Sequence, residues 1–203
     1  MRANLLLTTL LSLGVGGLAA CGESEAPADS ARASPPSEAA SAAPAPRAEI
    51  GATGSAELLD NGGEPIGTVS LTQAPTGLLM RIEAEGLTPG WHGIHLHAVG
   101  DCGDSAFQNA GGHINHAEPV PHGLMNPQGP DDGDLPNIYA DDRGRVRAEL
   151  FTTRARIADA GPGQWLWDED GSAVVIHANP DDHRSQPIGG AGDRVACAVV
   201  RRS

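Results

Sequence analysis

Lysine is absent from this chain of 203 residues, and aromatic residues make up only 3% of it. The 13 basic residues are therefore all arginines, and 26 acidic residues give a formal net charge of −13. A nucleic-acid partner would require a basic face, so this charge balance argues against one. The 27 glycines and 16 prolines suit many turns and short strands better than helices.

The chain also lacks an apolar run long enough to span a bilayer comfortably, which takes ~20 residues. Residues 5–18 are apolar and follow a single basic residue, Arg2, so residues 1–20 are predicted to be an export signal. The signal ends in Leu-Ala-Ala-Cys, which resembles a bacterial lipobox with Cys21 as the lipidated mature N-terminus. The alternative is an ordinary secretory signal followed by a chance cysteine.

Residues 21–47 are rich in Ala, Pro and Ser and have almost no large apolar side chains. Such a segment cannot bury enough surface to offset the entropy lost on ordering, so we expect a disordered tether. Residues 48–203 remain as one folded domain. The predicted protein is an exported, periplasmic or cell-envelope lipoprotein that meets the membrane only through its lipid. Gly22 after the cysteine favours the outer membrane.

Short segments with strand character recur along the domain, separated by turn sequences such as Asp60-Asn61-Gly62-Gly63. The predicted strands cover residues 55–59, 66–72, 78–85, 92–97, 138–139, 145–151, 173–178 and 194–200. This pattern predicts an antiparallel sandwich or barrel. Residues 98–137 and 179–193 are expected to be long loops, and each follows a strand that carries histidine, which favours a functional role.

Three histidines lie close together in GWHGIHLHAVGDC, residues 90–102. Side chains alternate between the two faces of a strand, so His95 and His97 share one face while Ile94 and Leu96 face the core. Two imidazoles on one rigid strand make half of a metal site, although a pair of exposed polar residues would show the same spacing. His92 has the opposite parity and is predicted to be a structural, hydrogen-bonded histidine.

Further donors occur later in the chain, and they favour the metal-site interpretation over the exposed pair. They are His113, His122, Asp134 and His177, the last at the end of the apolar strand AVVIH. Imidazole suits copper and zinc, and a set of histidines with a carboxylate suits zinc.

The chain resembles the copper/zinc superoxide dismutases, specifically their exported bacterial members. The resemblance covers about residues 52–201 and rests on GWHGIHLHAVGDC, AGGHIN, GDLPN, AVVIHANPDDH and GGAGDRVACAV, which occur in the family's order. It implies an all-β fold, an eight-stranded antiparallel Greek-key barrel of immunoglobulin-like sandwich type with two long functional loops. It also implies conversion of superoxide to oxygen and hydrogen peroxide by copper redox cycling, which would protect the cell envelope.

The resemblance further implies the site residues. Copper ligands would be His95, His97, His113 and His177, and zinc ligands would include His113, His122 and Asp134. His113 would bridge the two metals, leave copper on reduction and take up a proton. Arg194 would attract the superoxide anion, although a lone arginine can equally be a solvated charge.

Two more roles follow from the same resemblance. Asp181 would link a copper histidine, His95, to a zinc histidine, His122, and so fix the orientation of both rings. Cys102 and Cys197 would form a disulfide that pins the loop carrying metal ligands, a bond compatible with export. Alternatively, Asp181 would be a solvated loop carboxylate, and Cys102 and Cys197 would be free buried thiols.

One position departs from the family pattern. Members usually supply a third zinc histidine three residues before the zinc aspartate, and here that residue is Asp131. Either Asp131 ligates zinc through its carboxylate, or His116 takes this place, or zinc is weak or absent.

Two rival functions use the same residues. A non-catalytic envelope lipoprotein that stores or delivers copper or zinc would share the histidines but would not need Arg194. A binding scaffold with vestigial metal residues would not need a complete copper set. A homodimer is compatible with the sequence, which shows no interface residues.

Overall fold

The structure is a computed structural model that describes residues 50–115 and 119–202. The predicted signal, tether and lipidation site at Cys21 lie outside the described residues, as does His116. Within the described ranges, no helix is long and apolar enough to cross a membrane.

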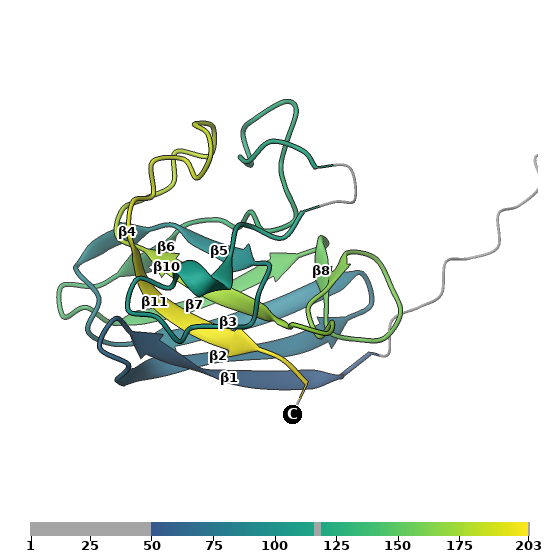
Figure 1. Cartoon of the computed structure of the whole chain (residues 1–203), viewed down its shortest axis with the longest axis horizontal. Helices are drawn as coiled ribbons and strands as arrows, with labels where there is room; N and C mark the ends of the chain where they lie inside the picture. The colour runs from purple at the N-terminus through teal and green to yellow at the C-terminus, as the bar shows by residue number, and fades with distance from the viewer. Residues whose placement is uncertain (1–49, 116–118, 203) are drawn as a thin grey trace, which may run out of the picture. The chain divides into compact units, whose positions relative to one another are not determined.

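Seven strands form one antiparallel sheet in the order β5-β10-β11-β1-β2-β3-β7, and Figure 1 shows it curling on itself. Their bounds are Thr53–Asp60 (β1), Pro65–Ala74 (β2), Gly77–Ala84 (β3), Ile94–His97 (β5), Val146–Thr152 (β7), Ser172–His177 (β10) and Arg194–Val200 (β11). Alternation along β2 gives the curled sheet a buried inner face and an exposed outer face. Val69 and Leu71 are buried, while Thr68 and Ser70 are exposed.

Two shorter strands complete the barrel. β4 (Gly90–His92) pairs with β6 (Ile138–Ala140), and β6 in turn contacts β7. β4 and β5 are the two halves of the strand predicted at residues 92–97. Counted as one strand, they make up the eight predicted strands together with β1, β2, β3, β6, β7, β10 and β11. β3 lies beside β7, the strand at one end of the sheet, while β5, which follows β3 and β4 along the chain, lies at the other end. This is the crossover of a Greek key.

The predicted strand 92–97 is wrong in one detail, because it is interrupted at Gly93. The Gly93 N–H donates to the carbonyl of Asn179 instead of continuing the ladder, at 2.8 Å, and a Cβ at this position would lie 2.9 Å from Ala191 Cβ. At this close approach of the second long loop, the chain changes from pairing with β6, through β4, to pairing with β10, through β5.

Two further elements have no counterpart in the predicted strands. The short strands β8 (Ala155–Arg156) and β9 (Gln164–Trp165) pair in parallel, in a connection between β7 and β10 that lacked an alternating pattern. A single 3₁₀ turn, η1 (Gln108–Ala110), lies within the first long loop. Neither element carries a predicted site residue.

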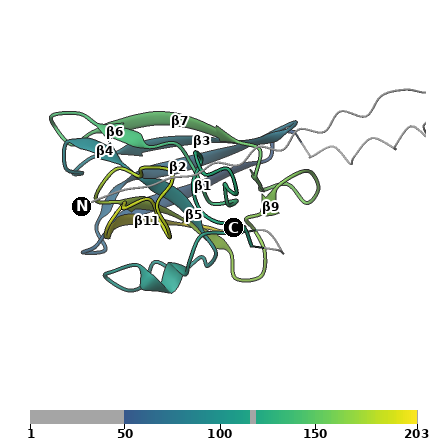
Figure 2. The same cartoon turned by 90° about the horizontal axis from the view of Figure 1, so that it is seen from above.

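The two long loops stand on the same side of the barrel in Figure 1, and Figure 2 views the barrel from above. They are joined by hydrogen bonds, since Met125 N–H donates to His183 O at 2.9 Å and Gln186 Nε2 donates to His122 O at 2.8 Å. A disulfide between Cys102 and Cys197, which are separated by 95 positions in sequence, ties the first loop to β11. The predicted disulfide is confirmed, and both loops are held over one end of the sheet.

Candidate metal centre

Three histidines converge on two neighbouring antiparallel strands, β5 and β10. His95 and His97 lie on β5, whose residues pair with β10, and His177 ends β10. One ring nitrogen from each of the three lies within 4.8 Å of the others. All three side chains are buried, with 0%, 0% and 1% exposed surface, so the pairing of β5 with β10 brings them together in the interior.

His113 joins this cluster from the first loop. Its ring centroid lies 4.2 Å from that of His95 and 5.2 Å from that of His97. A backbone bridge between His97 and His113 holds the loop against β5. Gly133 packs so closely on Leu96 O and on the His113 side chain that a Cβ there would overlap both. A glycine is therefore required at this point of the loop.

Each of the four rings is oriented by its outward nitrogen. His97 Nδ1–H donates to Gly111 O at 2.9 Å, and His177 Nδ1–H donates to Gly192 O at 3.1 Å. His95 Nε2–H donates to Asp181 Oδ2 at 3.0 Å, and His113 Nδ1 lies 2.9 Å from an oxygen of Asp131. Metal-binding histidines are commonly fixed in this way, because the outer bond sets both tautomer and ring orientation.

The inward nitrogens have no hydrogen-bond partner among the described residues. They are Nδ1 of His95 and Nε2 of His97, His113 and His177, all fully buried. An unpaired buried polar atom costs free energy, so four such nitrogens on neighbouring rings require an explanation. A metal ion with nitrogen ligands fits this donor set, since imidazole suits copper and zinc.

Burial also keeps three of these rings neutral, those of His95, His97 and His177. It lowers the pKa of His95 to about 3, that of His97 to about 2 and that of His177 to about 4. Removal from water disfavours the imidazolium form, and the neighbouring histidines add to the effect. The lone pairs therefore stay available to a metal at neutral pH.

A second cluster shares His113 and contains carboxylates. One atom each of His113, His122, Asp131 and Asp134 lies within 4.8 Å of the others. His122 and Asp134 form a close ion pair between Nδ1 and Oδ1. Burial acts to lower the pKa of His122, but its bonds to Asp134 and Asp181 outweigh burial and raise that pKa to about 10. A mixed nitrogen and oxygen set of four suits zinc.

Asp181 connects the two clusters. Its Oδ2 accepts from His95 Nε2 at 3.0 Å, and its Oδ1 lies 3.2 Å from His122 Nε2. Burial acts to raise the pKa of Asp181, but the hydrogen bonds from the two histidines hold it well below its usual range. Asn137 clamps the same residue, donating to Asp181 O at 2.8 Å and accepting from Asp181 N–H at 2.9 Å.

Arg194 lies at the mouth of the first cluster. It lines a cavity of about 350 Å³ together with His97, His113, His122 and Asp131. Its guanidinium donates to Gly111 O at 2.7 Å and to the carbonyl of Phe107. Burial lowers the pKa of Arg194, but the group stays cationic at neutral pH. The cavity thus presents a fixed positive charge beside the histidines.

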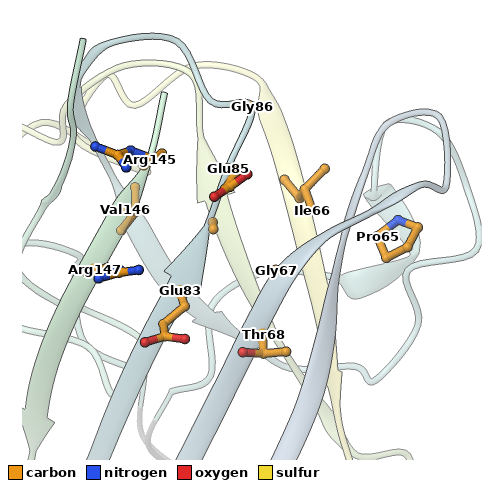
Figure 3. Close-up of a pocket in the computed structure, with 11 residues that line it drawn as sticks. Pro65, Ile66, Gly67, Thr68, Glu83, Glu85, Gly86, Arg145, Val146 and Arg147 are labelled. Carbon is orange, nitrogen blue, oxygen red and sulfur yellow. The ribbon is translucent and has the colours of Figure 1, made fainter. Parts of the chain in front are cut away.

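A larger cavity, of about 610 Å³, lies away from the histidines at the ends of β2, β3 and β7. Figure 3 shows its charged lining, with Glu83, Glu85, Arg145 and Arg147 around a floor of backbone that includes Gly67. Arg145 is already paired with Asp141 at 2.8 Å. No metal-ligand cluster found among the described residues lies here, so the smaller cavity is the functional candidate.

Two histidines outside the clusters behave differently from each other. His92 is structural as predicted, with its nitrogens 2.6 Å from His177 O and 2.7 Å from Thr88 O. His183 places Nδ1 3.2 Å from Asp181 Oδ2, with 21% of its side chain exposed. The loop turns back at His183, which has a φ of 61°.

Sequence reasoning also missed the groups that orient the ligands. Asn137, Gly111 O and Gly192 O act on ligands or on Asp181, but only Asn137 is a distinctive side chain, at the end of GDLPN. Backbone carbonyls leave no signal in the residue types. Their contribution becomes visible only once the loops are in place.

The assembled site now has two metal-type clusters sharing one histidine, with an arginine at the cavity. A family model described as copper/zinc superoxide dismutase (SODC) matches residues 65–200. The chain belongs to the copper/zinc superoxide dismutase family. Membership implies copper and zinc as the metals of the two clusters.

Individual members support the same assignment. The chain is 50% identical to Superoxide dismutase [Cu-Zn] of Caulobacter vibrioides over 139 residues, which cover 68% of this chain and 80% of that one. It is 42% identical to Superoxide dismutase [Cu-Zn] 2 of Aquifex aeolicus over 147 residues, covering 72% and 85%. The crystal structure of a SOD-like protein from Bacillus subtilis superposes with a TM-score of 0.69 at 32% identity, covering 73% and 99%.

Proposed function

We propose that this protein is a superoxide dismutase whose copper ion is held by His95, His97, His113 and His177. The observation that carries the proposal is the set of four buried inward nitrogens without partners, each on a ring whose other nitrogen is already engaged. Copper bound there would supply one-electron redox chemistry, which superoxide needs both to lose and to gain an electron. No other described cluster offers four such nitrogens.

Zinc would occupy the second cluster. His113, His122 and Asp134 would hold it, with Asp131 as the fourth ligand in place of the family's usual histidine. A set of two histidines and two carboxylates is chemically allowed for zinc. Support comes from His113, whose Nδ1 faces Asp131 while its Nε2 belongs to the copper cluster. The same ring can therefore serve both metals.

Arg194 would bring superoxide to the site. The substrate is a small anion, and a cation in a cavity of an acidic protein attracts it and can hydrogen-bond it. The guanidinium is anchored by two backbone carbonyls, so it keeps its position beside His97 and His113. His113 would be the proton carrier, because its side chain lines this cavity and its Nε2 has no hydrogen-bond partner among the described residues.

We also propose that the domain works at the cell envelope, exported and tethered through a lipid on Cys21. The apolar residues 5–18 followed by Leu-Ala-Ala-Cys support this location. The disulfide between Cys102 and Cys197 agrees with an oxidising compartment. Metabolic labelling with a radioactive fatty acid, lost in Cys21→Ala, tests the tether.

The test of the function is superoxide decay followed after pulse radiolysis, with the purified protein loaded with copper and zinc. We expect near diffusion-limited decay in the wild type and loss of activity in His113→Ala. Copper content measured on the same samples separates the alternatives. Tightly bound copper without accelerated decay would contradict the proposal and favour a metal-storage protein, and absence of both metals would favour a scaffold.

A further inference from the structure

Asp131 stands where the family pattern places a histidine, and its carboxylate is held in a fixed orientation. Oδ2 lies 2.9 Å from His113 Nδ1, and Oδ1 accepts the Gly133 N–H at 3.0 Å. The backbone N–H of Asp131 donates to Asp134 Oδ2 at 2.9 Å. Only 5% of the side chain is exposed.

The carboxylate decides which nitrogen of His113 carries hydrogen. A carboxylate accepts hydrogen bonds, so a neutral His113 ring presents Nδ1–H to Asp131 and leaves Nε2 as an acceptor. A neutral histidine at position 131 would impose no such choice, because each of its nitrogens can be either donor or acceptor. Nε2 of His113 is also the buried atom without a partner in the copper cluster.

We propose that Asp131 is a positioning residue for His113 that acts in place of zinc. It holds the ring with Nδ1–H on the carboxylate and Nε2 directed to the copper cluster, so the four-nitrogen set stays assembled when zinc is absent. The inference rests on the proposed function for the identity of the metal. It concerns copper binding, however, and can be tested apart from catalysis.

The decisive variant is Asp131→Asn, which keeps size and shape. The Gly133 N–H retains the side-chain oxygen, so the amide NH₂ of the variant turns to His113 and forces Nδ1 to accept. Hydrogen then moves to Nε2, where it blocks the copper position. We expect zinc-free full-length protein titrated with Cu(II) to lose 10- to 100-fold in copper affinity, as outer partners of metal ligands typically do.

Two spectra report the mechanism directly. In the metal-free protein, ¹⁵N NMR should show His113 protonated at Nδ1 in the wild type and at Nε2 in Asp131→Asn. In the copper-loaded, zinc-free protein, electron paramagnetic resonance should show four nitrogen ligands in the wild type and three in the variant. Asp131→Glu should restore both signatures. Asp142→Asn, an exposed carboxylate in the β6–β7 turn, removes the same charge and should change neither.

Equal copper affinity and identical spectra in the wild type and Asp131→Asn would overturn the inference. It would also be overturned if the variant lost copper only with zinc present, because Asp131 would then act through zinc. A matching loss in Asp142→Asn would make the effect one of net charge and would overturn it as well. If the wild type shows the four-nitrogen spectrum but no dismutase activity, the inference stands and the proposed function fails.

Discussion

Gly189 packs directly on the carboxylate of Asp181, so closely that a Cβ at this glycine would overlap Oδ1. Asp181 in turn orients His95 and His122. We expect Gly189→Ala to push the carboxylate off both rings and lower the affinity for copper and zinc about 10- to 100-fold. Competition with a chromophoric chelator measures both affinities.

The next residue supplies the control for this prediction. Gly190 has a φ of +71°, close to the +59° of Gly189, but a Cβ there would meet nothing within 4 Å. Gly190→Ala therefore carries similar backbone strain without touching Asp181. If both variants lost the same amount of metal affinity relative to the wild type, backbone strain and not displacement of the carboxylate would cause the loss.

Arg194 should govern the encounter with superoxide. Arg194→Gln removes the cation from the cavity, and we expect kcat/KM to fall by at least about tenfold at low salt. Screening by added salt should slow the wild type more than the variant. Arg201→Gln is the matched control, since Arg201 also donates to a loop carbonyl, Gly100 O at 2.7 Å, but does not line the cavity. A similar loss in both variants would refute a local role.

The disulfide should contribute much of the metal-free protein's stability. It closes a loop of 95 residues, which on the chain-entropy model corresponds to about 4–5 kcal/mol. Replacing the pair by Cys102→Ser and Cys197→Ala should lower the free energy of unfolding by about that amount in urea titrations. A reducing agent should destabilise the wild type equally and leave the variant unchanged. A loss below about 1 kcal/mol would contradict the entropic account.

The sequence was sufficient for the barrel and for most of the site, for a physical reason. Alternation in strands such as β2 reports burial directly, and the spacing of His95 and His97 places both rings on one face. The later ligands were assigned by resemblance to the family, and the structure brings them together. Metal-ligand residues can therefore be predicted from sequence when their position on a strand determines which way the side chain points.

What could not be predicted depends on loops and backbone. The break at Gly93 follows from contact with Asn179 and Ala191, which are distant in sequence. The same is true of the position of His183 against Asp181. The orientation of His97 and His177 depends on carbonyls of Gly111 and Gly192, which residue type does not reveal. Such contacts exist only after the two loops have docked.

The buried histidines should make the metal-free protein sensitive to acid. Burial holds the pKa of His95, His97 and His177 at about 3, 2 and 4, whereas an unfolded histidine titrates near 6.5. Below pH ~6.5 the unfolded chain therefore binds protons that the folded protein does not. Stability should fall as pH falls, by up to about 1.4 kcal/mol per pH unit for each histidine.

His122 changes the free energy of unfolding in the opposite direction, so it lowers stability at high pH. Its pKa is raised to about 10, so its contribution is complete below pH ~6.5 and is lost as pH rises through about 10. Urea unfolding of the metal-free protein should thus show maximal stability near pH ~6.5. His97→Gln, which cannot titrate, should reduce the acid slope by about the share of one histidine. A free energy of unfolding that is flat or rises between pH ~6.5 and ~4.5 would show that the three rings are not held neutral by burial.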